Sequence, residues 1–139
     1  MVSGRRLVSA SINGLPQESV ARLLQKSLIF MAFGHPEGFG LPLAEAAACG
    51  CYLIGYSGLG GRELLEIASS NHAGQEIPYG DWYAFVQACE QLNDRFNSDS
   101  RDLARCLLKN SKAIRDIYSA DAMIQSVQIA LTRWEAQLP

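Results

Sequence analysis

The residues best placed to do chemistry are two glutamates, Glu37 and Glu45, which lie eight positions apart after an apolar run. The first stands in a glycine-rich loop, 35–41, and the second lies one turn into the helix that we expect next. Because glycine has no side chain, such a loop lets main-chain amides approach a ligand closely. Carboxylates accept hydrogen bonds from hydroxyl groups. The pattern therefore suits a polyol that carries phosphate, as a nucleotide-sugar does.

The start of the expected helix offers backbone N–H groups as well. With Pro42 at the first helical position, the N-cap is Leu41, whose side chain accepts no hydrogen bond. Glu45 lies one place beyond the position that would complete a capping box. We therefore expect the amides of Leu43 and Ala44 to lack a side-chain partner, which leaves a site for an anion such as a diphosphate.

The same residues also have simpler interpretations. Gly38 and Gly40 would serve only a tight turn. Glu37 would be a solvated loop charge, and Glu45 would only favour the helix dipole. The histidines would be surface or packing residues and the later glycines plain turn residues (His35, His72; Gly58, Gly60, Gly61). Two glycine loops at one sheet edge, with paired carboxylates, favour a binding site over these alternatives.

The composition indicates an ordinary globular domain. At 139 residues and a net charge of −2, the chain is long enough for one domain with its own core and shows no bias towards disorder. Arg5-Arg6 is too short for a nucleic-acid patch, so no nucleic-acid partner is expected. No apolar run approaches the roughly 20 residues that cross a bilayer, and the N-terminus has no signal-peptide pattern.

The cysteines indicate a reducing environment rather than a metal site. The sequence has four, with neither a CxxC pair nor a histidine at ligand spacing, so no metal is expected (Cys49, Cys51, Cys89, Cys106). Their apolar surroundings favour reduced, buried thiols, which is typical of a cytoplasmic protein.

The first half of the chain has the hydrophobic pattern of parallel α/β structure. Leu7–Ile12 is a short β-type run, and a helix opened by Pro16 follows to about Lys26. Two continuous apolar runs are typical of strands buried on both faces, and helices follow them (strands 27–33 and 51–55; helices 42–49 and 62–68). Strand, helix and strand with short connections predict a right-handed βαβ unit.

Both glycine loops follow a predicted strand. Residues 34–41 and 56–61 leave the carboxyl ends of strands that we expect to be neighbours. Ligands of open α/β sheets bind outside the carboxyl ends of the strands. The two loops should therefore face one crevice.

The last part of the chain has the pattern of helices. We expect a short edge strand at Ile77 and a helix capped by Asp81. Three apolar stripes at helical spacing are expected to be core rather than a cofactor site (Phe85, Val86, Cys89, Leu92, Phe96; Leu103, Leu107, Ile114, Ile117; Met123, Val127, Ala130, Leu131, Trp134). The sequence thus predicts a parallel α/β unit followed by a helical tail.

In the segment that contains Glu37 and Glu45, the chain resembles the donor-binding half of GT-B glycosyltransferases of the group-1 (family 4) type. That signature has two glutamates eight apart around Glu-Gly-Phe-Gly-Leu-Pro, then Glu-Ala-x-Ala-x-Gly and a buried strand. Here it reads Glu37-Gly38-Phe39-Gly40-Leu41-Pro42-Leu43-Ala44-Glu45-Ala46-Ala47-Ala48-Cys49-Gly50. Three later segments are also similar to the family (Gly60-Gly61-Arg62-Glu63-Leu64; Gly80-Asp81; Tyr118-Ser119 with Trp134). The resemblance runs from about Ser9 to the end.

The resemblance implies transfer of sugar from a nucleotide-sugar with retention of configuration, with no metal and no further cofactor. Glu37 would be catalytic, near the reacting carbon, as nucleophile or as electrostatic support. The loop amides would hold sugar hydroxyls and phosphate (Gly38, Phe39, Gly40, Leu41). Glu45 would bind the ribose hydroxyls, and Gly60 and Gly61 would belong to the second donor-binding loop.

The resemblance also implies parts that this sequence does not show. A GT-B enzyme has a second, acceptor-binding domain. The front of its donor domain carries a Gly-Arg and a later Lys-Gly that neutralise the leaving diphosphate. Gly4-Arg5 resembles the first pair, but no lysine precedes Lys26. Because such cations stabilise developing charge, we expect the isolated chain to be inactive, whether it is a fragment, a gene remnant or a subunit that needs a partner chain. An open edge beyond the Leu7 run would allow a homo-oligomer.

We therefore expect an α/β fold with a Rossmann-like parallel sheet flanked by helices and a helical C-terminal tail. Residues 1–139 would form a single domain, equivalent to the later part of a GT-B nucleotide-sugar-binding domain. The expected function is the donor-binding portion of a glycosyltransferase with an unknown acceptor. The alternative is a non-catalytic nucleotide-sugar-binding or interaction module derived from such an enzyme.

Overall fold

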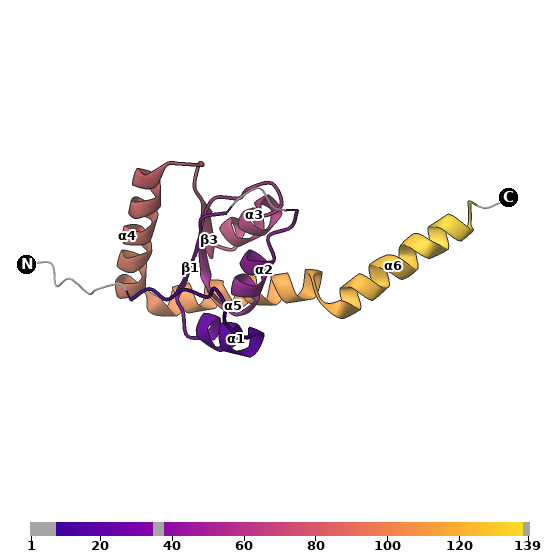
Figure 1. The fold of residues 1–139 in the computed structure, drawn as a ribbon, viewed down its shortest axis with the longest axis horizontal. Coiled ribbons are helices and arrows are strands. Elements are labelled where there is room, and N and C mark those ends of the chain that lie inside the picture. The colour runs from indigo at the N-terminus through magenta and orange to yellow at the C-terminus, as the bar shows by residue number, and fades with distance from the viewer. Residues whose placement is uncertain (1–7, 35–37, 138–139) are drawn as a thin grey trace, which may run out of the picture.

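Six helices and three short strands make up the part of the chain that the computed structural model describes, residues 8–34 and 38–137 (Figure 1). In chain order they are α1 (Gln17–Gln25), β1 (Ile29–Ala32), α2 (Leu41–Ala48), β2 (Tyr52–Gly55), α3 (Arg62–Ser70), β3 (Gly74–Glu76), α4 (Trp82–Ser98), α5 (Ser100–Ile117) and α6 (Ala120–Glu135). The α/β fold with a small parallel sheet flanked by helices confirms the predicted class.

The sheet is parallel throughout and its strands lie in the order β1-β2-β3. Ile29 pairs with Tyr52, and Leu53 pairs with Gly74. The predicted neighbouring strands are therefore adjacent. The prediction that the first strand is buried on both faces is wrong, because β1 lies at the edge of the sheet and Met31 is exposed.

Helices cover both faces of the sheet, and the core is accordingly divided in two. Successive strand residues point to opposite faces, so Leu53 packs in one cluster and Ile54 in the other. The first cluster joins β2 to α2 and α3, and the second joins it to α4. Figure 1 shows α4 on one side of the strands and α2 and α3 on the other. Helix α5 contributes Ile114 to the first cluster and Leu103 to the second.

Two predicted strands differ from the structure. Residues 8–12 form no strand and Leu7 lies outside the described residues, so the β-type run is not part of the sheet. Ile77 lies just after β3 rather than within it, is buried, and donates its N–H to the Gly55 carbonyl at 2.8 Å. In both places the apolar pattern identified residues with β propensity but not their pairing.

The predicted N-cap at Asp81 is confirmed. The Asp81 side chain accepts a hydrogen bond from the Ala84 amide at 2.9 Å, as expected for an N-cap. Asp99 and Ser119 cap α5 and α6 in the same way. These caps depend on side chains within one turn, so the local sequence is sufficient to specify them.

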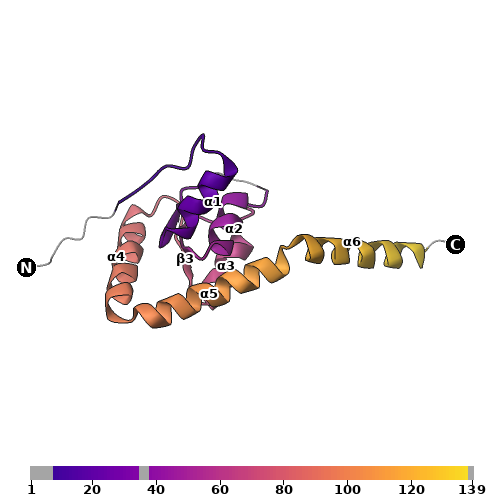
Figure 2. The same ribbon diagram turned by 90° about the horizontal axis from the view of Figure 1, so that it is seen from below.

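Helix α6 projects away from the rest of the chain, as Figures 1 and 2 show. None of its residues is buried. The prediction that its apolar stripe belongs to the core is therefore wrong. Helical spacing identifies a stripe, but a stripe becomes core only when another element covers it.

The cysteines are all free thiols, and Cys51 is the most buried of them. Its thiol donates to the Leu24 carbonyl at 3.2 Å, and burial raises its pKa to about 12. Cys49, Cys89 and Cys106 are only half-buried. Within residues 8–34 and 38–137, no helix is long and apolar enough to cross a membrane, and no three His, Cys, Asp or Glu side chains group together as metal ligands.

Candidate functional site

The two glycine loops lie against each other at the carboxyl edge of the sheet. They leave β1 and β2, which pair in register from Ile29 with Tyr52 to Ala32 with Gly55. A methyl group on Gly60 would overlap the Gly38 carbonyl and the Phe39 amide. A methyl group on Gly61 would come 2.6 Å from the Ser57 carbonyl oxygen. The second loop thus needs glycine at position 60 to pack against the backbone of the first, and glycine at position 61 to close on its own backbone, roles that sequence reasoning did not assign to them.

The start of α2 differs in detail from the prediction. Its N-cap is Gly40 rather than Leu41, and Gly40 has φ +79°, a conformation that glycine adopts without strain. As expected, no side chain caps the helix. The amides of Leu43 and Ala44 instead donate to the Gly40 carbonyl at 3.0 and 3.2 Å. Those two amides are therefore already bonded, and the anion site expected at them is not free in this conformation.

Glu37 and Glu45 are the two glutamates predicted to bind the donor. Glu37 lies outside the described residues. Glu45 is an exposed residue of α2 and forms no ion pair with any described residue. Its carboxylate adds to the effect of burial in raising the pKa of the Cys49 thiol. The convergence of the two carboxylates on one pocket stays a prediction.

Two of the donor-loop candidates, Gly40 and Gly61, line a cavity, and the other candidates among the described residues do not. This cavity of about 1050 Å³ is lined by Gly40 and Gly61 from the two loops, and it extends along the outer edge of β1 to residues 8–13. Its volume matches the upper end of the usual range for small-molecule sites. Of the other predicted loop residues, Gly38 and Leu41 are exposed, and Phe39 and Gly60 are half-buried.

Phe39 packs against a residue at the end of α5. Its ring meets the edge of Tyr118, at the end of α5, with ring centroids 5.1 Å apart. The Tyr118 hydroxyl is buried and has no hydrogen-bond partner among the described residues. Burial, and then the nearby Glu63 carboxylate, raise the pKa of Tyr118. Tyr118 therefore packs against the signature loop, with the Glu63 carboxylate of α3 nearby.

Four aromatic rings gather at the carboxyl ends of the strands, and sequence reasoning did not group them, although it placed Phe85 in the core stripe of its helix. Phe33 stacks on Phe85 with centroids 4.8 Å apart, and Tyr56 lies between Phe85 and Tyr79 at 5.9 and 5.2 Å. Phe33 and Tyr56 also line the large cavity. The sequence did contain a signal for this grouping, because an aromatic residue follows shortly after the end of each strand. We call Phe33, Tyr56, Tyr79 and Phe85 the aromatic cluster.

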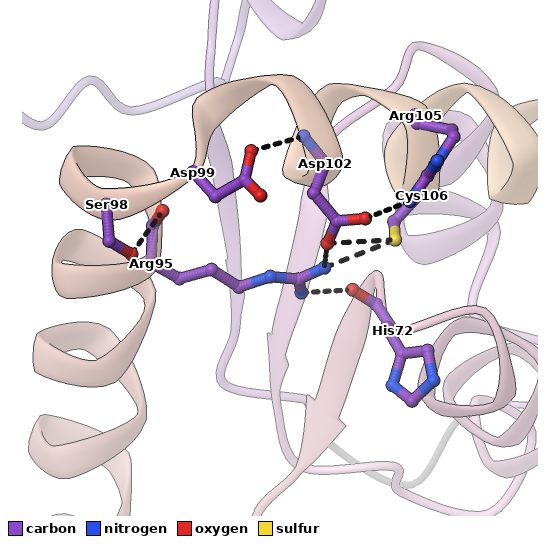
Figure 3. Close-up of polar contacts among 7 residues, drawn as sticks. All are labelled: His72, Arg95, Ser98, Asp99, Asp102, Arg105 and Cys106. Atoms are coloured by element: carbon purple, nitrogen blue, oxygen red, sulfur yellow. Dashed lines mark hydrogen bonds and ion pairs between the residues drawn. The ribbon is translucent and has the colours of Figure 1, made fainter.

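A polar cluster joins α4 and α5 to the segment before β3 (Figure 3). Arg95 donates to the His72 carbonyl at 2.6 Å and to Asp102 at 3.1 Å, and Arg105 also pairs with Asp102. The hydrogen bonds from Arg95 and Arg105 lower the pKa of Asp102. His72 contributes only its backbone carbonyl to these bonds and is exposed. This agrees with the interpretation of His72 as a surface residue. We assign this cluster a structural role.

The fold and the paired loops define a Rossmann-like α/β domain with a candidate ligand site at the carboxyl edge of its sheet. Comparison with known proteins then gives the family. The family model for group 1 glycosyl transferases matches residues 10–102, so the chain belongs to that glycosyltransferase family.

A curated relative agrees with this assignment. An alpha-1,6-glucosyltransferase from Actinobacillus pleuropneumoniae serotype 7 (strain AP76) is 34% identical over 88 residues, which is 63% of this chain. The chain spans 26% of the length of that relative. No solved structure shows significant similarity to the chain.

Proposed function

We propose that this chain binds the sugar donor in a retaining glycosyltransferase of the GT-B, family 4 type, with a nucleotide-sugar as substrate and no metal. The observation that carries the proposal is the packing of the two glycine loops against each other at the carboxyl edge, beside a cavity of about 1050 Å³. This is the edge at which open α/β sheets bind ligands. The cavity leaves room for a ligand that is mostly buried.

The residue roles follow from the chemistry of the donor. Glu37 would stand near the reacting sugar carbon, where a carboxylate stabilises an oxocarbenium-like transition state. The main chain of Gly38, Phe39 and Gly40, with Leu41, would hold sugar hydroxyls and phosphate. Glu45 would accept hydrogen bonds from the ribose hydroxyls, which suits an exposed carboxylate that forms no ion pair with a described residue.

Gly60 would act partly through the first loop, and Gly61 through the shape of the second. A larger residue at Gly60 would displace the backbone of Gly38 and Phe39, which we assign to donor binding, whereas one at Gly61 would meet the Ser57 carbonyl and the Leu43 side chain. We therefore infer that the second loop fixes the shape of the first and contributes to the donor site through that contact.

Activity would need more than this chain. The curated relative is longer, since the chain spans 26% of it, and a GT-B enzyme reacts between two domains. We infer that a partner domain or partner chain supplies the acceptor site and the cations that neutralise the diphosphate, so that the isolated chain is inactive. The free thiols support a reducing, cytoplasmic location for this assembly.

Donor binding is tested directly by removing the Glu45 carboxylate. A thermal-shift screen across common nucleotide-sugars would identify the donor, because a ligand that binds only the folded state raises the melting temperature. Glu45→Ala should weaken the binding of that donor about tenfold in calorimetry, since a charged hydrogen-bond partner contributes about 1.5–3 kcal/mol. It should leave the melting temperature of the free protein nearly unchanged.

Glu66→Ala is the matched control, because Glu66 is also an exposed helical glutamate but lies on α3. It should bind the donor as the unmutated chain does. The proposal is wrong if no nucleotide-sugar binds at millimolar concentration, or if both variants bind equally well. Sugar transfer by the isolated chain would contradict only the inference that it is inactive.

A second candidate is a non-catalytic binding module that assembles with itself. One observation favours it: among the described residues no strand pairs with the outer edge of β1, and Met31 on that strand is exposed. Open strand edges pair readily with other chains. Analytical ultracentrifugation at micromolar concentration would test this self-assembly. A monomer would exclude assembly through the outer edge of β1.

A further inference from the structure

Tyr118 brings a distant part of the chain to the loop that we assign to the donor. It lies beyond residues 10–102, which the family model matches, and far in sequence from Phe39. The centroids of the Tyr118 and Phe39 rings are 5.1 Å apart and their planes meet at 63°. An edge-on aromatic pair of this kind is stabilising beyond the area that it buries. The signature loop is therefore in contact with a residue that has no part in the donor roles assigned so far.

Helix α5 is fixed against α2, the helix that the signature loop enters. The hydroxyl of Ser111, a residue that is 4% exposed, donates to the Ala48 carbonyl at the end of α2 at 2.6 Å. Ile114, about one turn later, is buried in the core cluster that contains α2. Helix α5 thus follows α2 from Ala48 back towards the loop, and Tyr118 at its end reaches Phe39.

The backbone of Tyr118 is fixed on both sides. As the C-cap of α5, Tyr118 donates its N–H to the Ile114 carbonyl at 2.9 Å. The next residue, Ser119, caps α6 and accepts the Ala122 amide at 3.1 Å. Because a helix end restricts the backbone on each side, the Tyr118 ring is in place before any ligand binds.

Phe39 is contacted through its backbone as well as through its ring. Gly60 lies against the Phe39 amide, where an added methyl group would overlap it, and Tyr118 packs against the ring. Glycines stand on both sides of Phe39, at positions 38 and 40, and glycine gives a backbone many accessible conformations. Since only the correctly shaped loop offers its amides to the donor, any loss of that shape weakens the apparent affinity in proportion.

We propose that Tyr118 is a positioning residue for donor binding: its ring holds Phe39, and through Phe39 it keeps the signature loop in the conformation that receives the nucleotide-sugar. The inference rests on the proposed function, because the loop amides are those assigned to the donor. The ring and not the hydroxyl carries this role. Within residues 8–34 and 38–137 the buried Tyr118 hydroxyl has no hydrogen-bond partner, so it ties no described part of the loop in place.

Calorimetry with the nucleotide-sugar found in the thermal-shift screen tests this role. Tyr118→Ala should weaken donor binding about three- to tenfold, the contribution expected of one edge-on aromatic pair. Tyr118→Phe should bind the donor as the unmutated chain does, because phenylalanine keeps the ring. If Tyr118→Ala does not fold, Tyr118→Leu takes its place, since leucine keeps an apolar side chain without the ring.

A double-mutant cycle shows whether Tyr118 acts through Phe39. Phe39→Leu removes the partner ring and keeps an apolar side chain in the loop. In that background Tyr118→Ala should cause little further loss of donor affinity, because the ring contact is already gone. A loss as large as in the unmutated background would overturn the proposal.

Leu103→Ala is the matched control for stability, because Leu103 is 1% exposed on the same helix but packs in the second core cluster. It should lower the melting temperature and leave the donor affinity of the folded protein unchanged. A merely structural role for Tyr118 predicts that same outcome for Tyr118→Ala. That outcome, or a loss of donor binding in Tyr118→Phe, would contradict the positioning role.

The amide signals of Gly38 to Leu41, recorded by NMR without any ligand, separate this inference from the proposed function. Tyr118→Ala should shift or broaden those signals, and Leu103→Ala should not. If the signals change but no nucleotide-sugar binds the unmutated chain, the proposed function fails while Tyr118 is still shown to hold the loop. If the nucleotide-sugar binds Tyr118→Ala and the unmutated chain equally well, only the positioning role fails. Unchanged signals in Tyr118→Ala would overturn that role whatever the donor result.

Discussion

Helices α5 and α6 follow one another along the chain, and each carries apolar side chains at helical spacing. In α5 the stripe enters both halves of the core through Leu103 and Ile114, each 1% exposed, while Ile117 at the end of the helix is exposed. In α6 the equivalent stripe is exposed throughout, and Ile124 is 49% exposed. The difference teaches that an amphipathic pattern specifies a face, while the neighbouring elements decide whether that face is covered.

The largest expected effect is on the stability contributed by the two stripes. Ile114→Ala should lower the free energy of unfolding by about 2–5 kcal/mol, since it removes buried methyl groups and leaves a cavity. Ile124→Ala, the same change on α6, should alter it by less than about 0.5 kcal/mol. Urea denaturation of both variants measures the contrast. A large loss of stability from Ile124→Ala would mean that another element covers α6 in solution. It would contradict the difference in burial between α5 and α6.

A smaller effect is expected where the glycine loops meet, and it compares two glycines that face each other. Gly60→Ala should cost about 1–3 kcal/mol, because the methyl group would overlap the backbone of Gly38 and Phe39. Gly38→Ala should cost much less, because nothing lies within 4 Å of its added methyl group. Urea denaturation of the two variants is again the measurement. Equal losses would show that the loops are not in contact as described.

The smallest effect concerns charge, and it depends on pH. Asp102 and Asp121 both lie in the first turn of their helices, α5 and α6, so each interacts with a helix dipole. Only Asp102 also pairs with Arg95 and Arg105, which lowers its pKa. Asp102→Asn should therefore lower the melting temperature at pH 7 more than Asp121→Asn does.

The direction of the pH dependence follows from the lowered pKa. A carboxylate with a depressed pKa stabilises the folded state fully above its unfolded pKa of about 3.9, and loses that contribution as the pH falls through the folded value. The excess loss caused by Asp102→Asn should accordingly shrink below about pH 4, as measured by thermal melts between pH 2.5 and pH 7. An excess that does not change with pH would exclude the ion pairs as its cause.

The sequence was a good guide where structure depends on near neighbours. Asp81 was identified as a helix cap from its position before an apolar stripe, and its carboxylate does accept the Ala84 amide. It was a poorer guide to strands, since the apolar run before Asn13 does not pair with the sheet and Ile77 lies just outside β3. Strand pairing joins residues distant in sequence, so a β-type run alone does not reveal its partner.

In the candidate site, too, the features set by near neighbours were predictable and the contacts between distant segments were not. The two glycine loops and their common edge follow from the order of strands and helices. The contact of Gly60 with Gly38, and the edge-on packing of Tyr118 against Phe39, depend on backbone geometry that spacing does not express. The aromatic cluster was overlooked because its members are far apart in sequence and lie singly in three loops and a helix.

By itself, the amino-acid sequence determined the parallel α/β class, the signature loop from Glu37 to Glu45, and the faces of the helices, because periodicity and capping act within a few residues. The tertiary structure decided which faces are buried, which glycines touch, and which aromatic rings share one edge. Those properties depend on packing between segments, and packing is a property of the whole fold rather than of any one stretch of it.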